Sequence, residues 1–171
     1  MTDNILEKSF EHNTWANLQI IKACAALSDA QLDSEPQSAT KGSIRQTLVH
    51  LVDSERDYLS FFKGSEPWSG WQITPSFTEL EQVACFAGEG FAALAREYST
   101  NLPQDQIHLD DGYTMDPWVV MVQAINHATE HREQIKSMLS ALGVSPPRID
   151  GWKYGRVTNA LIPPTAEEKH Q

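Results

Sequence analysis

Hydrophobic positions recur at helical spacing in four long segments of the chain. They cover about residues 3–27, 43–62, 76–98 and 116–143. In each segment the apolar side chains return every three or four positions, as they do along one face of an amphipathic α-helix. The pattern therefore predicts four long helices.

Polar residues at the starts of these segments support the prediction. Ser43 with Gln46, and Ser76 with Glu79, have the form of a capping box, in which two side chains satisfy free N–H groups at a helix start. A proline follows Asp116, and proline at the first helical position loses no hydrogen bond that the helix needs. These signals fix where three of the four helices begin.

The segments between the helices add one small feature. Residues 107–109 and 113–115 alternate around a short turn, a pattern compatible with a small β-hairpin. Four amphipathic helices of this length imply an all-α fold, a four-helix bundle. We expect one bundle domain over residues 1–165 and a polar, flexible tail over residues 166–171.

Composition narrows the class of protein. The 171 residues carry a net charge of −10, with no basic cluster that would offset repulsion from nucleic acid. The longest apolar run, residues 118–122, is too short to cross a membrane, and the N-terminus shows no signal segment. Cys24 and Cys85 have the pattern of small buried apolar residues. We therefore expect a soluble, cytoplasmic protein that binds neither nucleic acid nor membrane.

A histidine motif in the last long helix is the main chemical signal. Residues 127–131 spell H-x-x-E-H, the signature of inverted zinc peptidases. At about 100° per residue, His131 lies about 40° from His127, and the wheel places both in the middle of the apolar stripe. It places Glu130 at the margin of that stripe and Arg132 facing water. The i, i+4 spacing of the histidines can bring both rings onto one cation.

Two known classes of metal protein do not fit. An inverted zinc peptidase needs a third ligand, a glutamate, much further downstream, but the chain ends 40 residues after His131. A carboxylate-bridged di-iron bundle needs Glu-x-x-His pairs, and no helix carries one. A metal at the two histidines therefore needs a partner from an earlier helix.

The second helix offers that partner. His50 borders the apolar face of this helix, which makes it the best candidate for a third ligand. Glu55 falls within the apolar face, where a carboxylate is unusual. Its side chain either extends to solvent or pairs with an arginine, or it supports a histidine or accepts a proton. The remaining histidines are expected at the surface.

Three stretches resemble a known family. They are residues 12–17 (HNTWAN), 43–51 (SIRQTLVHL) and 126–134 (NHATEHREQ). In this order and at this spacing they resemble the DinB/YfiT-like family, four-helix bundles regarded as metalloenzymes, over nearly the whole chain. Glu130 departs from the family pattern, since many relatives carry a second histidine there, and Glu133 replaces a usual glycine.

The resemblance implies one divalent metal ion, zinc, nickel or iron, held by His50, His127 and His131. It also implies an enzyme that acts on a small molecule, either a thiol-dependent transferase or a hydrolase. A low-molecular-weight thiol is the implied co-substrate. Three imidazoles leave a coordination position open for chemistry. Glu55 and Glu130 are the candidates for moving the proton.

Other interpretations remain open from the sequence. Asn13 and Asn17, in the apolar stripe of the first helix, either line the pocket, orient the histidines or make packing hydrogen bonds. The chain is also compatible with a non-catalytic metal-binding or dimerisation bundle, or with histidines that only hydrogen-bond to one another. A homodimer is compatible with the tryptophan-bearing loop at residues 64–75, which has the composition of a partner or lid surface.

Overall fold

The computed structural model describes residues 4–35, 42–62, 65–98, 106–109 and 111–163, and structural statements below concern this part of the chain. It is mostly helical, which confirms the all-α prediction. The elements in chain order are α1 (Ile5–Cys24), α2 (Asp29–Asp33), α3 (Ile44–Ser60), α4 (Phe77–Tyr98), β1 (Ile107–His108), β2 (Thr114–Met115), α5 (Pro117–Ala141) and α6 (Gly151–Val157).

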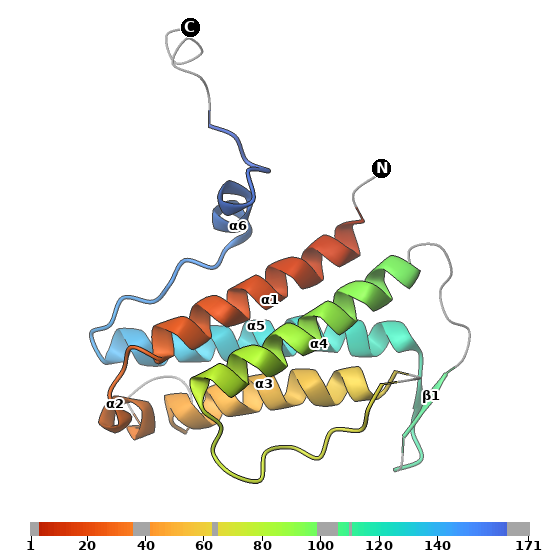
Figure 1. The fold of residues 1–171 in the computed structure, drawn as a ribbon, viewed down its shortest axis with the longest axis horizontal. Helices are drawn as coiled ribbons and strands as arrows, with labels where there is room; N and C mark the ends of the chain where they lie inside the picture. The colour runs from red at the N-terminus through yellow and green to blue at the C-terminus, as the bar shows by residue number, and fades with distance from the viewer. Residues whose placement is uncertain (1–3, 36–41, 63–64, 99–105, 110, 164–171) are drawn as a thin grey trace, which may run out of the picture.

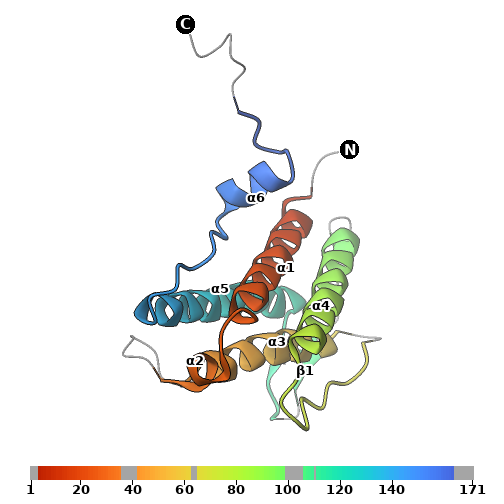
Figure 2. The same ribbon diagram turned by 60° about the vertical axis from the view of Figure 1, so that its left-hand side comes forward.

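The four long helices form the bundle in two pairs. In Figure 1, α1 lies beside α4, and α3 runs beside α5 across them. Figure 2 shows the same pairing from another side, with α6 standing apart above the bundle next to α1. Contacts of α3 with α4 and of α1 with α5 close the ring, so each long helix packs on two others.

The capping signals hold in the structure. Ser43 and Gln46 form the expected capping box, and the side chains of Ser76 and Glu79 bond each other's backbone N–H groups. Pro117 is the first residue of α5. α1 is shorter than predicted: it ends at Cys24, and the separate short helix α2 follows, which the sequence pattern did not reveal.

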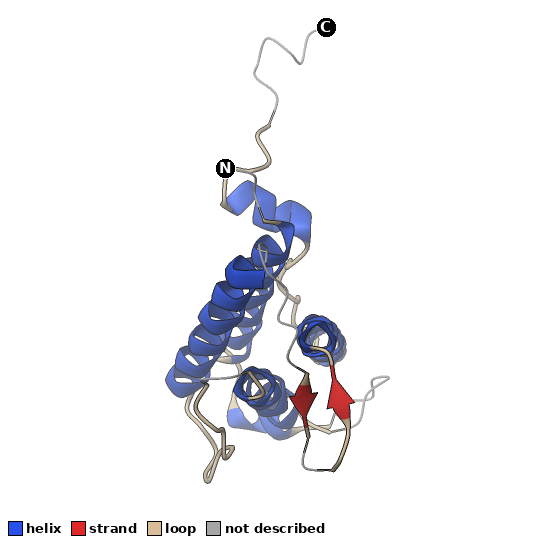
Figure 3. Ribbon diagram, turned by 90° about the vertical axis from the view of Figure 1, so that its right-hand side faces the viewer, coloured by secondary structure: helices blue, strands red, loops and turns tan. Residues whose placement is uncertain are grey.

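A two-stranded ribbon precedes α5, as the alternating pattern predicted. Ile107 pairs with Met115 and His108 with Thr114 in antiparallel register. Figure 3 shows the ribbon at the end of the bundle, next to the start of α5. The predicted tail at residues 166–171 lies outside the described residues, and α6 was not predicted.

The buried interior contains two apolar clusters. One gathers around Ile20, Leu51 and Ile135, and the other around the stacked rings of Phe10 and Phe91, whose centroids are 4.8 Å apart. Along α1 and α3, buried polar residues separate the clusters. Asn13 follows Phe10 of one cluster and precedes Ala16 of the other, and Glu55 lies between Val52 and Leu59 in the same way.

None of the helices in the described ranges combines the length and the apolar character that a bilayer crossing requires.

Candidate metal centre

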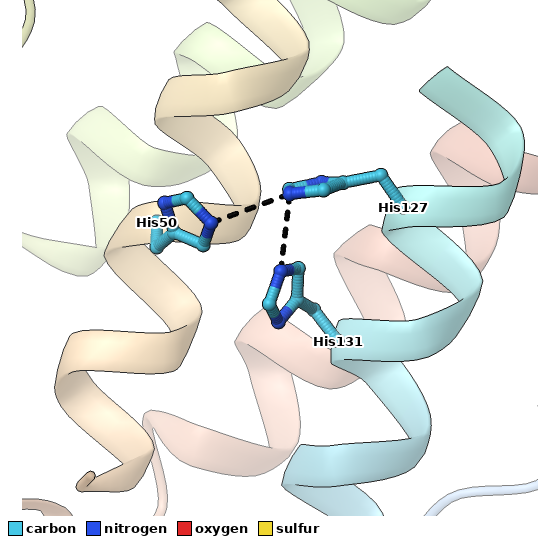
Figure 4. Close-up of side chains that lie close together, drawn as sticks. All are labelled: His50, His127 and His131. Atoms are coloured by element: carbon cyan, nitrogen blue, oxygen red, sulfur yellow. Dashed lines mark hydrogen bonds between the residues drawn. The ribbon is translucent and has the colours of Figure 1, made fainter. Parts of the chain in front are cut away.

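Three histidines meet between α3 and α5 (Figure 4). His50 comes from α3, while His127 and His131 come from consecutive turns of α5. The Nε2 atom of His127 lies 3.3 Å from His50 Nε2 and 3.1 Å from His131 Nε2. Among the described residues, these three form the group of possible ligands close enough to share one ion, with all three atoms within 4.8 Å of one another.

The distances between the ring nitrogens suit a small divalent cation. Tetrahedral zinc binds imidazole nitrogens at about 2.0–2.1 Å, which places two such nitrogens about 3.3 Å apart. The two closest Nε2 pairs in this group measure 3.1 and 3.3 Å. Three neutral imidazoles also form a donor set that zinc, nickel and iron accept. The residues therefore fit the implied metal.

Hydrogen bonds between the three histidines do not by themselves account for these contacts. His131 Nδ1 lies 2.7 Å from Gln134 Oε1, an oxygen that only accepts, so Nδ1 carries the proton and Nε2 is bare. The Nε2 of His127 faces both this bare nitrogen and His50 Nε2. A ring nitrogen offers either one proton or one lone pair, so it satisfies only one of the two neighbours. One cation would satisfy all three.

The histidines lie at the edge of the buried face, not in its middle as the helical wheel predicted. His127 and His131 are half-buried and His50 is exposed. On the helical wheel, the centre of the buried residues of α5 lies about 80° from His127. The buried face extends that far because Arg132, at its other edge, is buried against α1. This position makes the group of histidines accessible from solvent.

Arg132 is the clearest correction to the sequence analysis. It was expected to face water, but it is only 4% exposed. It lies at the opposite edge of the same stripe, where α1 supplies acceptors for its guanidinium. The Nη1 atom donates to Asn13 Oδ1 at 2.6 Å and to Asn17 Oδ1 at 2.7 Å, and Nη2 donates to Thr129 Oγ1 at 2.9 Å.

The same two asparagines hold Glu55. Asn13 Nδ2 donates to one carboxylate oxygen at 2.5 Å, and Asn17 Nδ2 donates to the other at 2.6 Å. Glu55, 2% exposed, therefore lies within a buried network that joins α1, α3 and α5. We call Asn13, Asn17, Glu55 and Arg132 the polar layer. Of the alternatives for Glu55, the structure favours pairing with an arginine: the side-chain amides of Asn13 and Asn17 bridge Glu55 and Arg132.

Glu130 lies elsewhere. It is exposed on α5 and makes no hydrogen bond or ion pair with any described residue. Its predicted role in proton transfer stays a prediction.

Two residues that the sequence analysis did not single out contact the histidines. Gln134 accepts from His131 Nδ1, and Ser54 Oγ lies 3.3 Å from His50 Nδ1. Each contacts the ring nitrogen that faces away from the group and so holds the ring in place. The Gln134 oxygen, which only accepts, also fixes the tautomer of His131. Spacing is the signal that could have revealed them, since each lies three or four positions after its histidine on a helix.

Burial and the neighbouring rings favour the neutral form of His50 and His127. Burial, together with the neighbouring His131 and His50, lowers the pKa of His127 to about 4. Burial also lowers the pKa of His50, with His131 acting in the same direction and Asp53 opposing it. Neutral imidazole is the form that binds metal, so the site is prepared for a cation at neutral pH.

A cleft of about 560 Å³ adjoins the group of histidines. His50 forms part of its wall, together with Asp53 of α3 and Trp71, Ile73 and Pro75 of the following loop. The indole Nε1 of Trp71 is buried and has no acceptor among the described residues. Ile73 is 78% exposed, which leaves apolar surface at the rim.

Comparison with known protein families gives a match over nearly the whole chain. The sequence model of the DinB family matches residues 1–169, essentially the whole chain. The chain belongs to the DinB family. No curated protein matches it. Within this DinB-family bundle, the motif stretches at residues 43–51 and 126–134 supply the three histidines that the structure brings together.

Proposed function

We propose that this DinB-family chain is a divalent-metal-dependent enzyme that acts on a small molecule, with its metal held by His50, His127 and His131. The observation that carries the proposal is the convergence of three Nε2 atoms from two helices on one point. The DinB family is associated with metal, which supports the same assignment.

The donor set favours catalysis over a closed structural site. Three protein ligands leave a position for water or substrate, whereas structural zinc sites use four. A bound zinc-type ion supplies a Lewis acid that brings the pKa of water near 7 and favours the thiolate form of a thiol. Thiol transfer and hydrolysis are the two reaction classes that this chemistry supports, and a low-molecular-weight thiol is the proposed co-substrate.

The surroundings of the site support access by a small molecule. His50 is exposed and shares the cleft with Trp71, so a ligand in the cleft would reach the open side of the group. The indole ring of Trp71 and the side chain of Ile73 offer apolar contact to a ligand in the cleft. Glu130, exposed on the helix of two ligands, is the proposed proton carrier.

Metal analysis tests the ligand assignment. The wild-type protein should carry one equivalent of zinc, nickel or iron after dialysis, and His50→Ala and His127→Ala should each lose it. His108→Ala is the matched control, because His108 is exposed on β1 and bonds Thr114, outside the group of three histidines. Full metal content in either ligand variant would refute the three-histidine assignment.

A second measurement separates catalysis from simple metal binding. The metal-loaded protein should consume a low-molecular-weight thiol with an electrophile, or hydrolyse an ester or amide, in a panel assay, and the His127→Ala variant should not. Metal bound without a position open to exchangeable water would favour the alternative, a non-catalytic metal-binding or dimerisation bundle.

A further inference from the structure

The polar layer links the helices that carry the histidines. Glu55 comes from α3 and Arg132 from α5, and each asparagine of α1 donates to the carboxylate and accepts from the guanidinium. Both charged groups are therefore tied to the same two amides. The path closes on itself, so no member can move without breaking at least one short hydrogen bond.

Stability alone explains this arrangement poorly. Burying two charges costs free energy that their attraction rarely repays in full, and well-packed apolar residues often do as well or better. Burial raises the pKa of Glu55 to about 7 in spite of Arg132 and the two asparagines, so the charged carboxylate is disfavoured by its site. What a satisfied buried network does provide is a single fixed arrangement.

The layer lies close to the histidines along both helices. Glu55 follows His50 by five residues on α3, and Arg132 directly follows His131 on α5. A helix with its side chains has a radius of about 5–6 Å, so a rotation of about 10° moves a side-chain tip by about 1 Å. Metal–ligand distances tolerate about ±0.2 Å.

We propose that the polar layer fixes the rotation of α3 and α5 about their axes, so that the three histidine Nε2 atoms converge. Its members are positioning residues of the metal centre and take no direct part in proton transfer. They are Asn13, Asn17, Glu55 and Arg132. This inference rests on the proposed metal binding and adds to it the device that holds the ligands in place.

Two variants in the full chain test the inference. Glu55→Gln keeps the size of the side chain but turns one acceptor into a donor, so one asparagine amide loses its partner. Asn17→Ser removes one bridge and leaves the other through Asn13. Both should weaken Zn²⁺ binding about 10–100-fold in a competition assay with a chromophoric chelator. Both should also change the visible absorption spectrum of the Co²⁺-loaded protein, which reports ligand geometry.

Leu59→Ala is the control for loss of stability. Leu59 is buried on α3, in the apolar cluster around Phe10, and its side chain takes no part in the hydrogen bonds of the layer or of the histidines. Its truncation should destabilise the fold at least as much as either test variant. Measured below its unfolding transition, Leu59→Ala should keep the wild-type Zn²⁺ affinity and Co²⁺ spectrum.

The outcomes separate the two proposals. If wild-type protein binds Zn²⁺ and both layer variants bind it with the same affinity and spectrum, the positioning role is overturned while the proposed metal site stands. If Leu59→Ala weakens binding as much as Asn17→Ser, general loss of stability explains the effect and the positioning role again falls. If wild-type protein binds no divalent metal, the metal centre and its positioning fall together.

Discussion

At the scale of the residue, the ring of His131 is held from both sides. Its Nδ1 donates to Gln134 Oε1 at 2.7 Å, while Nε2 points to the other two histidines. This bond keeps the proton on Nδ1 and leaves the Nε2 lone pair for a cation. The precision of the site therefore depends on residues that are not ligands.

Removing that acceptor should weaken the site without unfolding the protein. We expect Gln134→Ala to lower Zn²⁺ affinity about 10–100-fold, because the ring loses its fixed tautomer and orientation. Competition with a chelator measures the effect. Ser137→Ala, an exposed change on the same helix, is the control and should bind as the wild type does. Equal affinity in Gln134→Ala would show that the bond to His131 has no role in binding.

The buried carboxylate predicts a pH dependence of stability. Burial raises the pKa of Glu55 from 4.5 to about 7, so folding favours its protonated form. The corresponding stability is complete below about pH 4.5 and is lost as the pH rises through about 7. Relative to Glu55→Gln, the free energy of unfolding of the wild type should fall by up to about 3 kcal/mol over this window.

Urea unfolding of both proteins at pH 5, 6, 7 and 8 measures this difference. Histidine titration is common to the two proteins and cancels when one curve is subtracted from the other. A difference that stays constant with pH, or that grows in favour of the wild type as the pH rises, would contradict the prediction.

The sequence indicated the three histidines more readily than the residues that hold them in place. His127 and His131 share a helix, so spacing alone places them together. His50 was identified because a metal at these two histidines needs a third ligand, and His50 borders the apolar face of an earlier helix. Arg132 was misplaced because a helical wheel gives an angle but not the neighbour at that angle. The asparagines of α1 accept hydrogen bonds from the guanidinium at that edge of α5, which allows Arg132 to be buried there.

At the scale of the element, α1 and α4 approach closely at one glycine. A Cβ atom at Gly88 would lie 2.0 Å from Thr14 Oγ1 and 2.6 Å from Thr14 Cγ2. Thr14 Oγ1 already bonds the carbonyl of Phe10, so its side chain has little freedom to turn away. The missing side chain is what allows this pair of helices to pack.

Gly88→Ala should therefore destabilise the fold. Overpacking costs about 1–3 kcal/mol, and the gain in helix propensity returns at most about 1 kcal/mol. Thermal unfolding should show a lower midpoint. Gly151→Ala is the matched control, because a Cβ there meets no atom within 4 Å. An unchanged or raised midpoint in Gly88→Ala would show that α1 and α4 can separate without penalty.

Element boundaries were predictable where a side chain marks them. The capping residues Ser43 and Ser76 begin their helices as expected. α2 was missed because five residues carry too little periodicity to stand out. The prediction extended α1 past Cys24 because the apolar side chains that follow continue the helical pattern, although the helix itself ends there.

At the scale of the whole molecule, a bound metal would join α3 to α5 only in the folded state. An ion that binds the native protein and not the unfolded chain stabilises it by about 2.7 kcal/mol at 100 times its Kd. Zinc should therefore raise the unfolding midpoint of the wild type, and a chelator should reverse the change. His127→Ala should show no response, and a zinc-induced rise in that variant would indicate binding elsewhere.

The class of fold was predictable because four amphipathic segments must bury four apolar faces against one another. Which helices become neighbours was not. Pairing of α1 with α4 depends on Gly88 meeting Thr14, and pairing of α3 with α5 depends on contacts between residues far apart in the chain. Periodicity describes each helix alone and carries no information about its partner.

The last described segment, residues 150–163, has a further consequence. None of the residues of α6 is buried, and its seven residues are fewer than a helix needs to persist alone in water. Its main attachment is the ring of Tyr154, with centroids 5.3 Å from both His12 and Trp15 of α1. Amide hydrogen exchange should be fastest here, and limited proteolysis should cut this arm first. The trimmed protein would still contain all three histidines.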